Sequence, residues 1–432
     1  SIPRHFPQHI SHEISQYFQT SSNIIHNFFP YRFFYRKISI ILFYINPHQT
    51  RRLTRKLRKD SDNMKFSCEK LLLQSAIATA SRTVAIKSAI PALEGILLQA
   101  NTQLTISGYN MQTGIRTTLD AEITEEGALV LPARLFGEII RRLPDDIVTF
   151  TSDTGLNVHL TCGDANYNII AMSADDYPEL PEVEDQYSIH IRQQLLRSMI
   201  SETAFAVSTD EARPIHTGSL FEISEEGLTV VSVDGFRLAL RREPLEGVKG
   251  GSFRFVAPGS ALNEVEKICE DSDEEAVITL GSRHLLFEVG SKQLICRRLE
   301  GEFLDYKAAI PRVNPIAVTA STKALITSID RVSVVISEKQ KSPVQCVFDN
   351  GRITMSAKTV NGEARDMCPI NGDGNGLTIG FNNRYLMEAL KYAPADAVRL
   401  ELNTGISPCI ILPTEGEERF LYMVLPVRLK NN

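Results

Sequence analysis

EKLLLQSAIATA, residues 69–80, has a pattern that two later stretches of the chain repeat. The repeats are RQQLLRSMISETA at residues 192–204 and TKALITSIDRVSV at residues 322–334. All three have apolar residues at helical spacing, which places Leu72, Leu195 and Leu325 in register. Repetition at a fixed period indicates similar units in tandem, and the spacing predicts three units of about 123 residues each.

A second helical pattern falls between the copies of the first. Its copies begin at residues 132, 258 and 382 and read PARLFGEIIRRL, PGSALNEVEKIC and NNRYLMEALKYA. Short β-branched segments bounded by turn residues follow each of the six helices, as in GLTVVSV and AVRLEL. The sequence therefore predicts an α+β fold of three similar domains, each made of two helix-plus-strands units. We place these domains at residues 64–185, 186–313 and 314–432, with links at DQYSIHI and PRVNPIAV.

Residues 1–63 differ in kind from the rest, since they are rich in His, Phe, Tyr, Ile and Asn and show no persistent period. They hold ten basic and three acidic residues, whereas residues 64–432 hold 36 basic and 49 acidic ones. The apolar run ISIILFYI, residues 38–45, is far shorter than the ~20 residues of a membrane-spanning helix. A targeting segment and translated upstream sequence both fit this composition. We favour the second and expect the fold to begin at Met64.

The seven cysteines are scattered between Cys68 and Cys409 and never form a C-x-x-C pair. That pattern fits free, mostly buried thiols in a reducing compartment, so we expect a cytoplasmic protein. The four histidines after residue 63 lack zinc-site spacing, and NGDGNG at residues 371–376 has Asn382 where a calcium loop requires Glu. We therefore expect neither a metal nor a cofactor.

The sequence contains no nucleophile elbow and no phosphate-binding loop motif, which favours a binding function over an enzyme. The best catalytic candidates are Asp234 and Arg237 in VSVDGFRLAL, residues 231–240, where polar residues interrupt an apolar run. This stretch holds one of three equivalent positions between strands, and a repeated position is rarely a lone catalytic centre. We interpret Asp234 as a turn acid beside Gly235, which permits the turn. An enzyme centred on Asp234 and Arg237 is the alternative.

Basic residues are distributed over all six predicted helices, although the body of the chain is acidic. They are Lys70, Arg134, Arg141, Arg142, Arg192, Arg197, Lys267, Lys323, Arg331, Arg384 and Lys391. If the repeats place the six helices on one face, that face attracts phosphates. Ordinary solvated helix faces explain such residues when each helix is taken singly. Their recurrence on six helices favours a phosphate-binding face.

Residues 64–429 resemble the bacterial DNA polymerase III beta subunit family, the replication sliding clamps. The resemblance rests on MKF, IPALEGILLQA, VLPARLFGEIIRRLP, VDGFRLAL, LEGEFLDYKAAIP, IGFNNRYLMEAL and YMVLPVRL, in family order and at family spacing. It implies a non-enzymatic ring of two chains around duplex DNA, with helices lining the hole and antiparallel sheets outside. It also implies partners that bind through short linear peptides, namely the polymerase catalytic subunit, the clamp loader and repair polymerases. A repeat scaffold that binds proteins without encircling DNA is the second alternative.

The resemblance places a peptide pocket between the second and third domains. By family position this pocket comprises Val233, Gly235, Phe236, Arg237, Leu238, His216, Leu304, Ala308, Ala309, Asn382, Tyr385, Met423, Val424, Leu425, Pro426, Val427 and Arg428. Apolar peptide anchors are expected against Leu238, Val424, Leu425 and Pro426, with Arg237 and Arg428 at the rim. His216, Leu304 and Phe236 depart from the commonest family residues, so we expect a pocket of different shape.

The DNA-binding and dimer-interface residues form two further sets. The predicted DNA-binding residues are Arg82, Lys87, Arg134, Arg141, Arg142, Arg192 and Arg197, and Lys87 matches a basic position of the family. Ring closure is expected to bring Tyr167 and Ile169 of one chain against Val335 and Ile336 of a second copy. The protein is thus expected to be a homodimer without any membrane association.

Overall fold

The computed structural model describes residues 63–184, 186–245, 252–337, 342–416 and 419–429. The expectations for the leader therefore lie outside the described residues, apart from Asn63. Among the residues that are described, no helix is long and apolar enough to cross a membrane.

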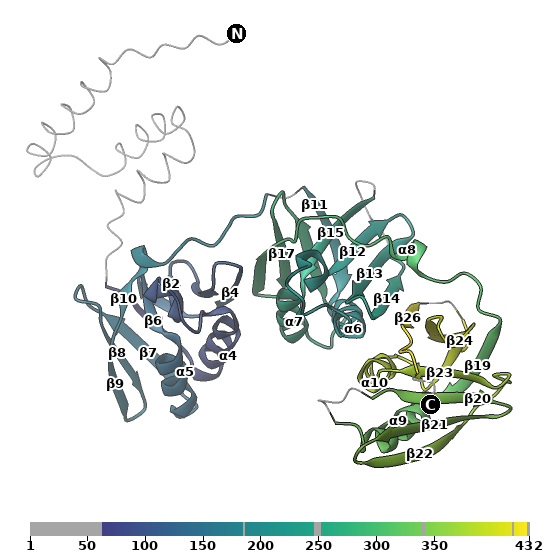
Figure 1. The fold of residues 1–432 in the computed structure, drawn as a ribbon. Coiled ribbons are helices and arrows are strands. Elements are labelled where there is room, and N and C mark those ends of the chain that lie inside the picture. The colour runs from purple at the N-terminus through teal and green to yellow at the C-terminus, as the bar shows by residue number, and fades with distance from the viewer. Residues whose placement is uncertain (1–62, 185, 246–251, 338–341, 417–418, 430–432) are drawn as a thin grey trace, which may run out of the picture. The chain divides into compact units, whose positions relative to one another are not determined.

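Six of the helices form three pairs, α4 with α5, α6 with α7 and α9 with α10, as the sequence predicts (Figure 1). Their bounds are Lys70–Ala80 for α4, Ala133–Arg142 for α5, Gln193–Ala204 for α6, Gly259–Ile268 for α7, Thr322–Ser333 for α9 and Asn383–Lys391 for α10. The short helix α8 is Tyr306–Ala309, and 3-10 turns occur at Ser81–Thr83, Pro91–Glu94, Ala174–Asp176 and Pro214–Thr217.

The register predicted for the first helix of each pair is wrong by one residue in two of the three cases. Leu73, Leu196 and Leu325 are each the fourth residue of their helices, and all three are buried. Leu72 is instead 45% exposed. Runs of adjacent leucines allow two registers at helical spacing, and the first residue of the helix decides between them.

The strands of the described residues form four antiparallel sheets. The first has the order β5 (Glu122–Glu125), β1 (Lys65–Glu69), β7 (Ile147–Ser152), β8 (Asn157–Cys162) and β9 (Ala165–Ile170). The second has the order β10 (Met172–Ser173), β6 (Gly127–Pro132), β2 (Gly95–Ala100), β3 (Leu104–Tyr109), β4 (Thr113–Leu119), β18 (Lys292–Arg297), β17 (His284–Val289), β16 (Glu275–Leu280) and β11 (Tyr187–Arg192).

The remaining two sheets hold strands from the middle and the C-terminal parts of the chain. The third has the order β15 (Phe253–Pro258), β12 (Gly218–Ser224), β13 (Gly227–Val233), β14 (Arg237–Glu243), β26 (Phe420–Val424), β25 (Cys409–Pro413), β24 (Ala397–Leu402) and β19 (Ile316–Ser321). The fourth has the order β22 (Gly362–Pro369), β21 (Arg352–Thr359), β20 (Val344–Asp349) and β23 (Leu377–Phe381).

Three repeats follow from this topology. We call α4, α5 and β1 to β10 the first repeat, α6, α7 and β11 to β18 the second, and α9, α10 and β19 to β26 the third. The predicted α+β fold of three similar parts, each with two helices and antiparallel sheets, is confirmed.

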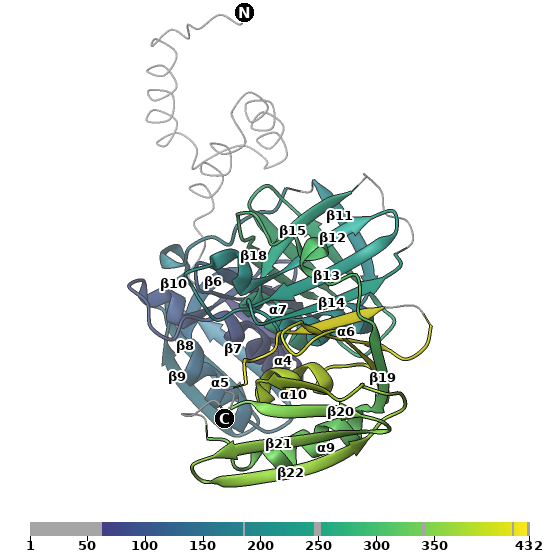
Figure 2. The same ribbon diagram turned by 45° about the vertical axis from the view of Figure 1, so that its right-hand side comes forward.

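The repeats are joined to one another by strand pairing. β4 of the first repeat pairs with β18 of the second, with Ile115 opposite Leu294. β14 of the second pairs with β26 of the third, with Ala239 opposite Tyr422, and Figure 2 shows the yellow C-terminal strand beside β14. Within the described residues, β9 and β22 have no partner on their outer sides, since they are the last strands of the first and fourth sheets.

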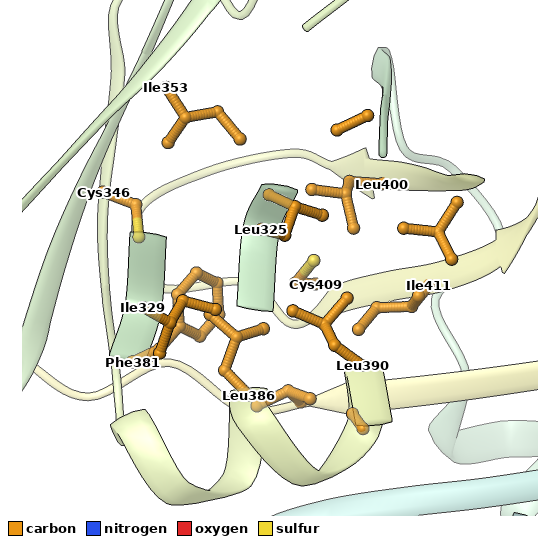
Figure 3. Packing of buried hydrophobic residues seen from close by; sticks show 14 of the residues in the cluster. Leu325, Ile329, Cys346, Ile353, Phe381, Leu386, Leu390, Leu400, Cys409 and Ile411 are labelled. Atoms are coloured by element: carbon orange, nitrogen blue, oxygen red, sulfur yellow. The ribbon is translucent and has the colours of Figure 1, made fainter. Parts of the chain in front are cut away.

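Each repeat has its own apolar core between its helices and its sheets. In the third repeat, Leu325 of α9 and Leu386 and Leu390 of α10 pack against Phe381 and Leu400 from the two sheets (Figure 3). Burying one such leucine contributes about 1.5–3 kcal/mol, so these contacts hold each helix pair firmly on its sheets.

Candidate functional site

The stretch VSVDGFRLAL forms the hairpin between β13 and β14. Gly235 has a φ of 89° at the turn, a conformation that other residues adopt only with strain. The carboxylate of Asp234 accepts hydrogen bonds from the backbone amides of Phe236 and Arg237, at 2.9 and 3.0 Å. Asp234 is therefore a turn acid, as predicted, and not a free general base.

Arg237 lies inside the molecule and bridges the second and third repeats. Its side chain is only 7% exposed, and its Nε lies 3.0 Å from the Asp234 carboxylate. Its other two nitrogens bind the Glu388 carboxylate of α10 and, at 2.6 Å, the Phe205 carbonyl oxygen. The guanidinium also lies over the Tyr385 ring, 4.7 Å from its centroid. The expectation that Arg237 pairs with a bound peptide at the pocket rim stays a prediction, and within the chain its donors are already engaged.

The ion pairs of Arg237 also set the ionisation of Glu388. Burial raises the pKa of Glu388, but hydrogen bonds from Arg237 and Arg384 outweigh burial and hold the pKa below its ordinary value. Glu388 is therefore a carboxylate at neutral pH, and the bridge between the two repeats is fully charged.

Strand alternation decides which predicted pocket residues can share one surface. Leu238 pairs with Met423, and Arg237 pairs with Val424, so the two pairs point to opposite faces of the third sheet. Leu238 and Met423 belong to an apolar cluster with Val233, whereas Val424 is buried in the core of the third repeat. The prediction that a peptide anchor packs against the Val424 side chain is therefore wrong.

Exposed apolar side chains border the cluster around Leu238. Phe236 is 57% exposed and stacks on Tyr385, with 5.7 Å between the ring centroids. The segment after β26 runs beside the turn, since the Leu425 amide donates to the Phe236 carbonyl oxygen at 2.9 Å. Leu304 and Val427 are also exposed. Pro426 is half-buried and Arg428 exposed, so both are accessible to a ligand.

The other predicted pocket residues lie nearby or serve the backbone. Asn382 caps α10, because its side-chain oxygen accepts from the backbone amides of Arg384 and Tyr385. The His216 ring lies edge-on to Phe303, an apolar-cluster residue, with centroids 5.6 Å apart, and burial lowers the pKa of His216. Ala308 and Ala309 end α8, where Ala308 is exposed and Ala309 half-buried.

The predicted DNA-binding residues differ in whether a carboxylate of the chain already pairs with them. Lys87, Arg134 and Arg197 are exposed and have no carboxylate partner in the described part of the chain. Arg141 and Arg142 both pair with Glu138, and Arg192 lies 3.2 Å from Asp273. Arg82 lies 3.6 Å from Glu264 of α7 and so links the first repeat to the second.

Helix α4 corrects the view that every helix presents a basic residue. Lys70 is buried, and its ammonium donates to Asp145 at 2.8 Å. The exposed residues of α4 are Leu71, Leu72, Ser75 and Ala78. This helix therefore presents no cation on its exposed side.

The predicted dimer residues lie in the first and the third repeats. Tyr167 and Ile169 lie in β9, an edge strand, and Ile169 is buried against the first core. Val335 and Ile336 follow α9 and pack partly on the third core. The two sets lie in different repeats and do not contact each other within one chain. Each set is therefore available to the other set of a second chain.

Sequence reasoning missed two residues that position the pocket turn. Glu388 and the Phe205 carbonyl fix Arg237, yet they lie 151 and 32 residues away from it in the sequence. No local motif indicates either contact.

Comparisons with known proteins agree with this geometry. Family models of the DNA polymerase III beta subunit match in three parts, the N-terminal domain at residues 64–181, the central domain at 190–305 and the C-terminal domain at 307–428. The chain belongs to the DNA polymerase III beta subunit family. Two relatives named beta sliding clamp, from Synechocystis sp. and Staphylococcus epidermidis, are 31% and 30% identical, over 85% and 84% of this chain and 100% and 99% of their own length. The solved DNA polymerase sliding clamp of Bacillus subtilis is 28% identical with a TM-score of 0.81, covering 85% of this chain and all of its own.

Membership of the beta subunit family argues against an enzyme centred on Asp234 and Arg237. Family members are polymerase accessory subunits rather than catalysts. The geometry agrees, because both side chains are committed to the turn and to the bridge between repeats. No group of three metal-binding side chains occurs in the part of the chain that the structure describes.

Proposed function

We propose that this chain is a DNA sliding clamp, a homodimeric ring that encircles duplex DNA and holds the replicative polymerase on its template. One observation carries the proposal. The two junctions between successive repeats are closed by strand ladders, β4 with β18 and β14 with β26, while β9 and β22 remain open edges among the described residues. A second copy closes both edges at once, because each chain supplies one edge of each kind.

The internal repeats predict the register of this closing ladder. Ala357 follows the core residues Ile353 and Met355 of β21 as Ser232 follows the core residues Leu228 and Val230 of β13, so Ala357 and Ser232 are equivalent. Ala364 pairs with Ala357 and Ala239 pairs with Ser232, so Ala364 and Ala239 are equivalent too. Tyr167 in β9 and Tyr422 in β26 are equivalent in the same way, through Leu160 and Ile411. Tyr422 lies opposite Ala239 inside the chain. Tyr167 is therefore expected opposite Ala364 of the second copy.

Cysteine cross-linking tests this closure at single-residue resolution. The proposed register puts Asn168 of one chain opposite Glu363 of the other, and both side chains are exposed in the single chain. Directly opposite residues of an antiparallel pair have Cα atoms about 4.5–5.5 Å apart, which is within the range of about 4.4–6.8 Å that a disulfide spans. The double variant Asn168→Cys with Glu363→Cys should form covalent dimers on mild oxidation.

The matched control shifts one cysteine along the same face of β9. Asn166→Cys with Glu363→Cys places the thiols on a diagonal, about 7–8 Å apart between Cα atoms, and should cross-link poorly. The seven native cysteines are all buried, so they should add little background. Equal cross-linking of both variants would contradict the proposed register, and no cross-linking of either would contradict the closure.

Duplex DNA is proposed to pass through this ring beside the exposed cations. Lys87, Arg134 and Arg197 support this role, since each is free to neutralise a phosphate. Contacts to phosphates alone carry no sequence information, so the ring can slide. A scaffold that binds proteins without encircling DNA would be retained equally on circular and linear DNA.

The apolar cluster beside VSVDGFRLAL is proposed to bind linear peptides of the polymerase, the clamp loader and repair polymerases. Leu238, Met423 and Leu425 supply the wall for apolar anchors, with Phe236 and Val427 at its exposed border. Leu425→Ala should weaken a clamp-binding peptide by roughly 1–3 kcal/mol, or about fivefold to 150-fold, in fluorescence polarisation. Unchanged affinity in a folded, dimeric variant would remove Leu425 from the pocket.

We also place the protein in the cytoplasm. All seven cysteines are free and buried, and burial raises the pKa of the Cys269 and Cys346 thiols to about 12. Such unpaired thiols fit a reducing compartment.

A further inference from the structure

A row of charged side chains crosses one end of the third sheet. Arg254 of β15 lies opposite Glu222 of β12, which lies opposite Thr229 of β13, which in turn lies opposite Arg242 of β14. Directly opposite residues point to the same face of a sheet, so the four side chains share one surface.

This charged row lies on the same face as the proposed peptide pocket. Leu220 lies two residues before Glu222 on β12, and Leu240 lies two residues before Arg242 on β14. Val231 lies two residues after Thr229 on β13. All three belong to the apolar cluster that contains Leu238. Side chains two residues apart on a strand point to the same side. The face thus changes from apolar at Leu238 to charged at Arg242.

Helix α8 separates the pocket from a hollow over the charged row. The ring of Tyr306 belongs to the apolar cluster, while its hydroxyl donates to the Glu222 carboxylate at 2.5 Å. Lys307 adds a charge 3.4 Å from the same carboxylate. The hollow has a volume of about 810 Å³ and is lined by Glu222, Arg242, Arg254, Tyr306 and Lys307 among others. We call it the α8 groove.

The α8 groove carries unused positive charge on an acidic chain. Neither Arg242 nor Arg254 has a carboxylate within ion-pair distance among the residues that the structure describes, and both are exposed. Burial raises the pKa of Tyr306, and Arg242 opposes that rise, which places the Arg242 guanidinium near the hydroxyl. Glu222 is already engaged by Tyr306 and Lys307. Of the lining acids, Glu226 is exposed at the hairpin turn, while Glu243 is buried and paired with Arg241.

The distance between the pocket and the α8 groove sets the length of a peptide that can bind to both. Leu238 and Arg242 are four residues apart on β14, which corresponds to about 13–14 Å along the strand. An extended peptide covers this span in about four residues, and a few more if it passes around α8.

We propose that the α8 groove binds acidic residues of a partner peptide, four to six residues from the apolar anchor that packs on Leu238. The proposal rests on the pocket assigned under the proposed function and extends it to the flank of the peptide. Carboxylates of the partner pair with Arg242 and Arg254, while the anchors supply most of the affinity.

The test compares two synthetic peptides that share one clamp-binding motif. One carries Glu at the fourth, fifth and sixth positions from the anchor, and the other carries Gln at the same three positions, each in versions with the flank before or after the motif. In fluorescence polarisation at low salt, the Glu peptide with the correct flank should bind the full chain about three- to tenfold more tightly. The preference should fall towards unity at 0.5 M salt, because exposed ion pairs are screened.

Two variants locate the effect. Arg242→Gln with Arg254→Gln should abolish the preference for Glu while the affinity for the Gln peptide stays unchanged. The control is Arg352→Gln, an exposed arginine of β21 in the third repeat, which should keep the preference.

Three results would overturn the proposal. Equal affinity of the wild type for the Glu and Gln peptides in both flank versions would show that the groove does not bind acidic residues. A preference that persists in the double variant would place the acid-binding site elsewhere. Binding of neither peptide would show that the pocket itself is misassigned, and the groove proposal would fall with the pocket.

Discussion

At the scale of single residues, Arg237 ties the second repeat to the third. It is buried with Asp234, Glu388 and the Phe205 carbonyl as partners, so its removal leaves Asp234 without a cation and Glu388 with Arg384 alone. Breaking such a pair from one side costs about 3–5 kcal/mol. Arg237→Ala should therefore lower the urea midpoint of the first unfolding transition clearly.

The conservative variant separates charge from geometry. Arg237→Lys keeps the charge but cannot reach three partners with one ammonium, so it should restore only a small part of the lost stability. An unchanged midpoint in Arg237→Ala would show that the bridge contributes nothing to the junction of the repeats.

The same bridge predicts a pH dependence. The folded pKa of Glu388 lies below its ordinary value of 4.5, so its contribution to stability is present above that value and is lost as the pH falls through the folded pKa. Acidification below about pH 4.5 should destabilise the wild type more than Glu388→Gln. Parallel stability curves for the two proteins between pH 6 and pH 3 would contradict this assignment.

Residue-scale interpretation from sequence succeeded where the causes are local. The turn role of Asp234 follows from its two neighbouring amides and from Gly235. The partners of Arg237 were not predictable, since they depend on how two repeats pack. The faces of Arg237 and Val424 were missed for a related reason. Family position does not state which way a strand residue points, whereas the ladder of β14 and β26 does.

At the scale of elements, the helices are unequal contributors to DNA binding. Arg134 of α5 and Arg197 of α6 are exposed without a carboxylate partner in the described residues. Each phosphate contact contributes about 0.9 to the slope of log affinity against log salt. Arg134→Gln with Arg197→Gln should lower that slope by up to about 1.8 without changing sequence preference, measured by anisotropy on duplex DNA.

Arg82 and Lys87 provide a sharper comparison within one connection after α4. Arg82 already pairs with Glu264, whereas Lys87 is exposed without a carboxylate partner in the described chain. Lys87→Gln should therefore reduce the salt slope more than Arg82→Gln. A larger effect of Arg82→Gln would show that its pair with Glu264 gives way to DNA.

Element types were largely predictable, because helical periodicity and turn residues act locally. The six long helices lie where the two repeated patterns predict them. Basic composition was a weaker guide, since it does not show that Lys70 is buried against Asp145. The joining of β4 to β18, and of β14 to β26, also leaves no local signal in the sequence.

At the scale of the whole molecule, a closed ring requires two copies of the chain. Val335 is the second residue after the end of α9, and Ala206 is the second residue after the end of α6. Ala206 packs into the core of the next repeat along the chain, the third. Val335 should enter the first core of a second copy in the same manner. Val335→Asp should yield monomers in sedimentation, because closure would bury an unpaired charge.

A control separates closure from a general effect of added charge. Ile406→Asp places the same charge on an exposed residue between β24 and β25 and should leave the dimer intact. A dimer of unchanged dissociation constant in Val335→Asp would count against the proposed closure.

Topological trapping on DNA distinguishes a closed ring from an open scaffold. The protein should be loaded by its clamp loader onto nicked circular DNA, and half of each sample should then be linearised with a restriction enzyme. Gel filtration in high salt, which screens phosphate contacts, should retain the protein on circles and release it from linear molecules. Equal loss from circular and linear DNA would contradict a closed ring that encircles the duplex.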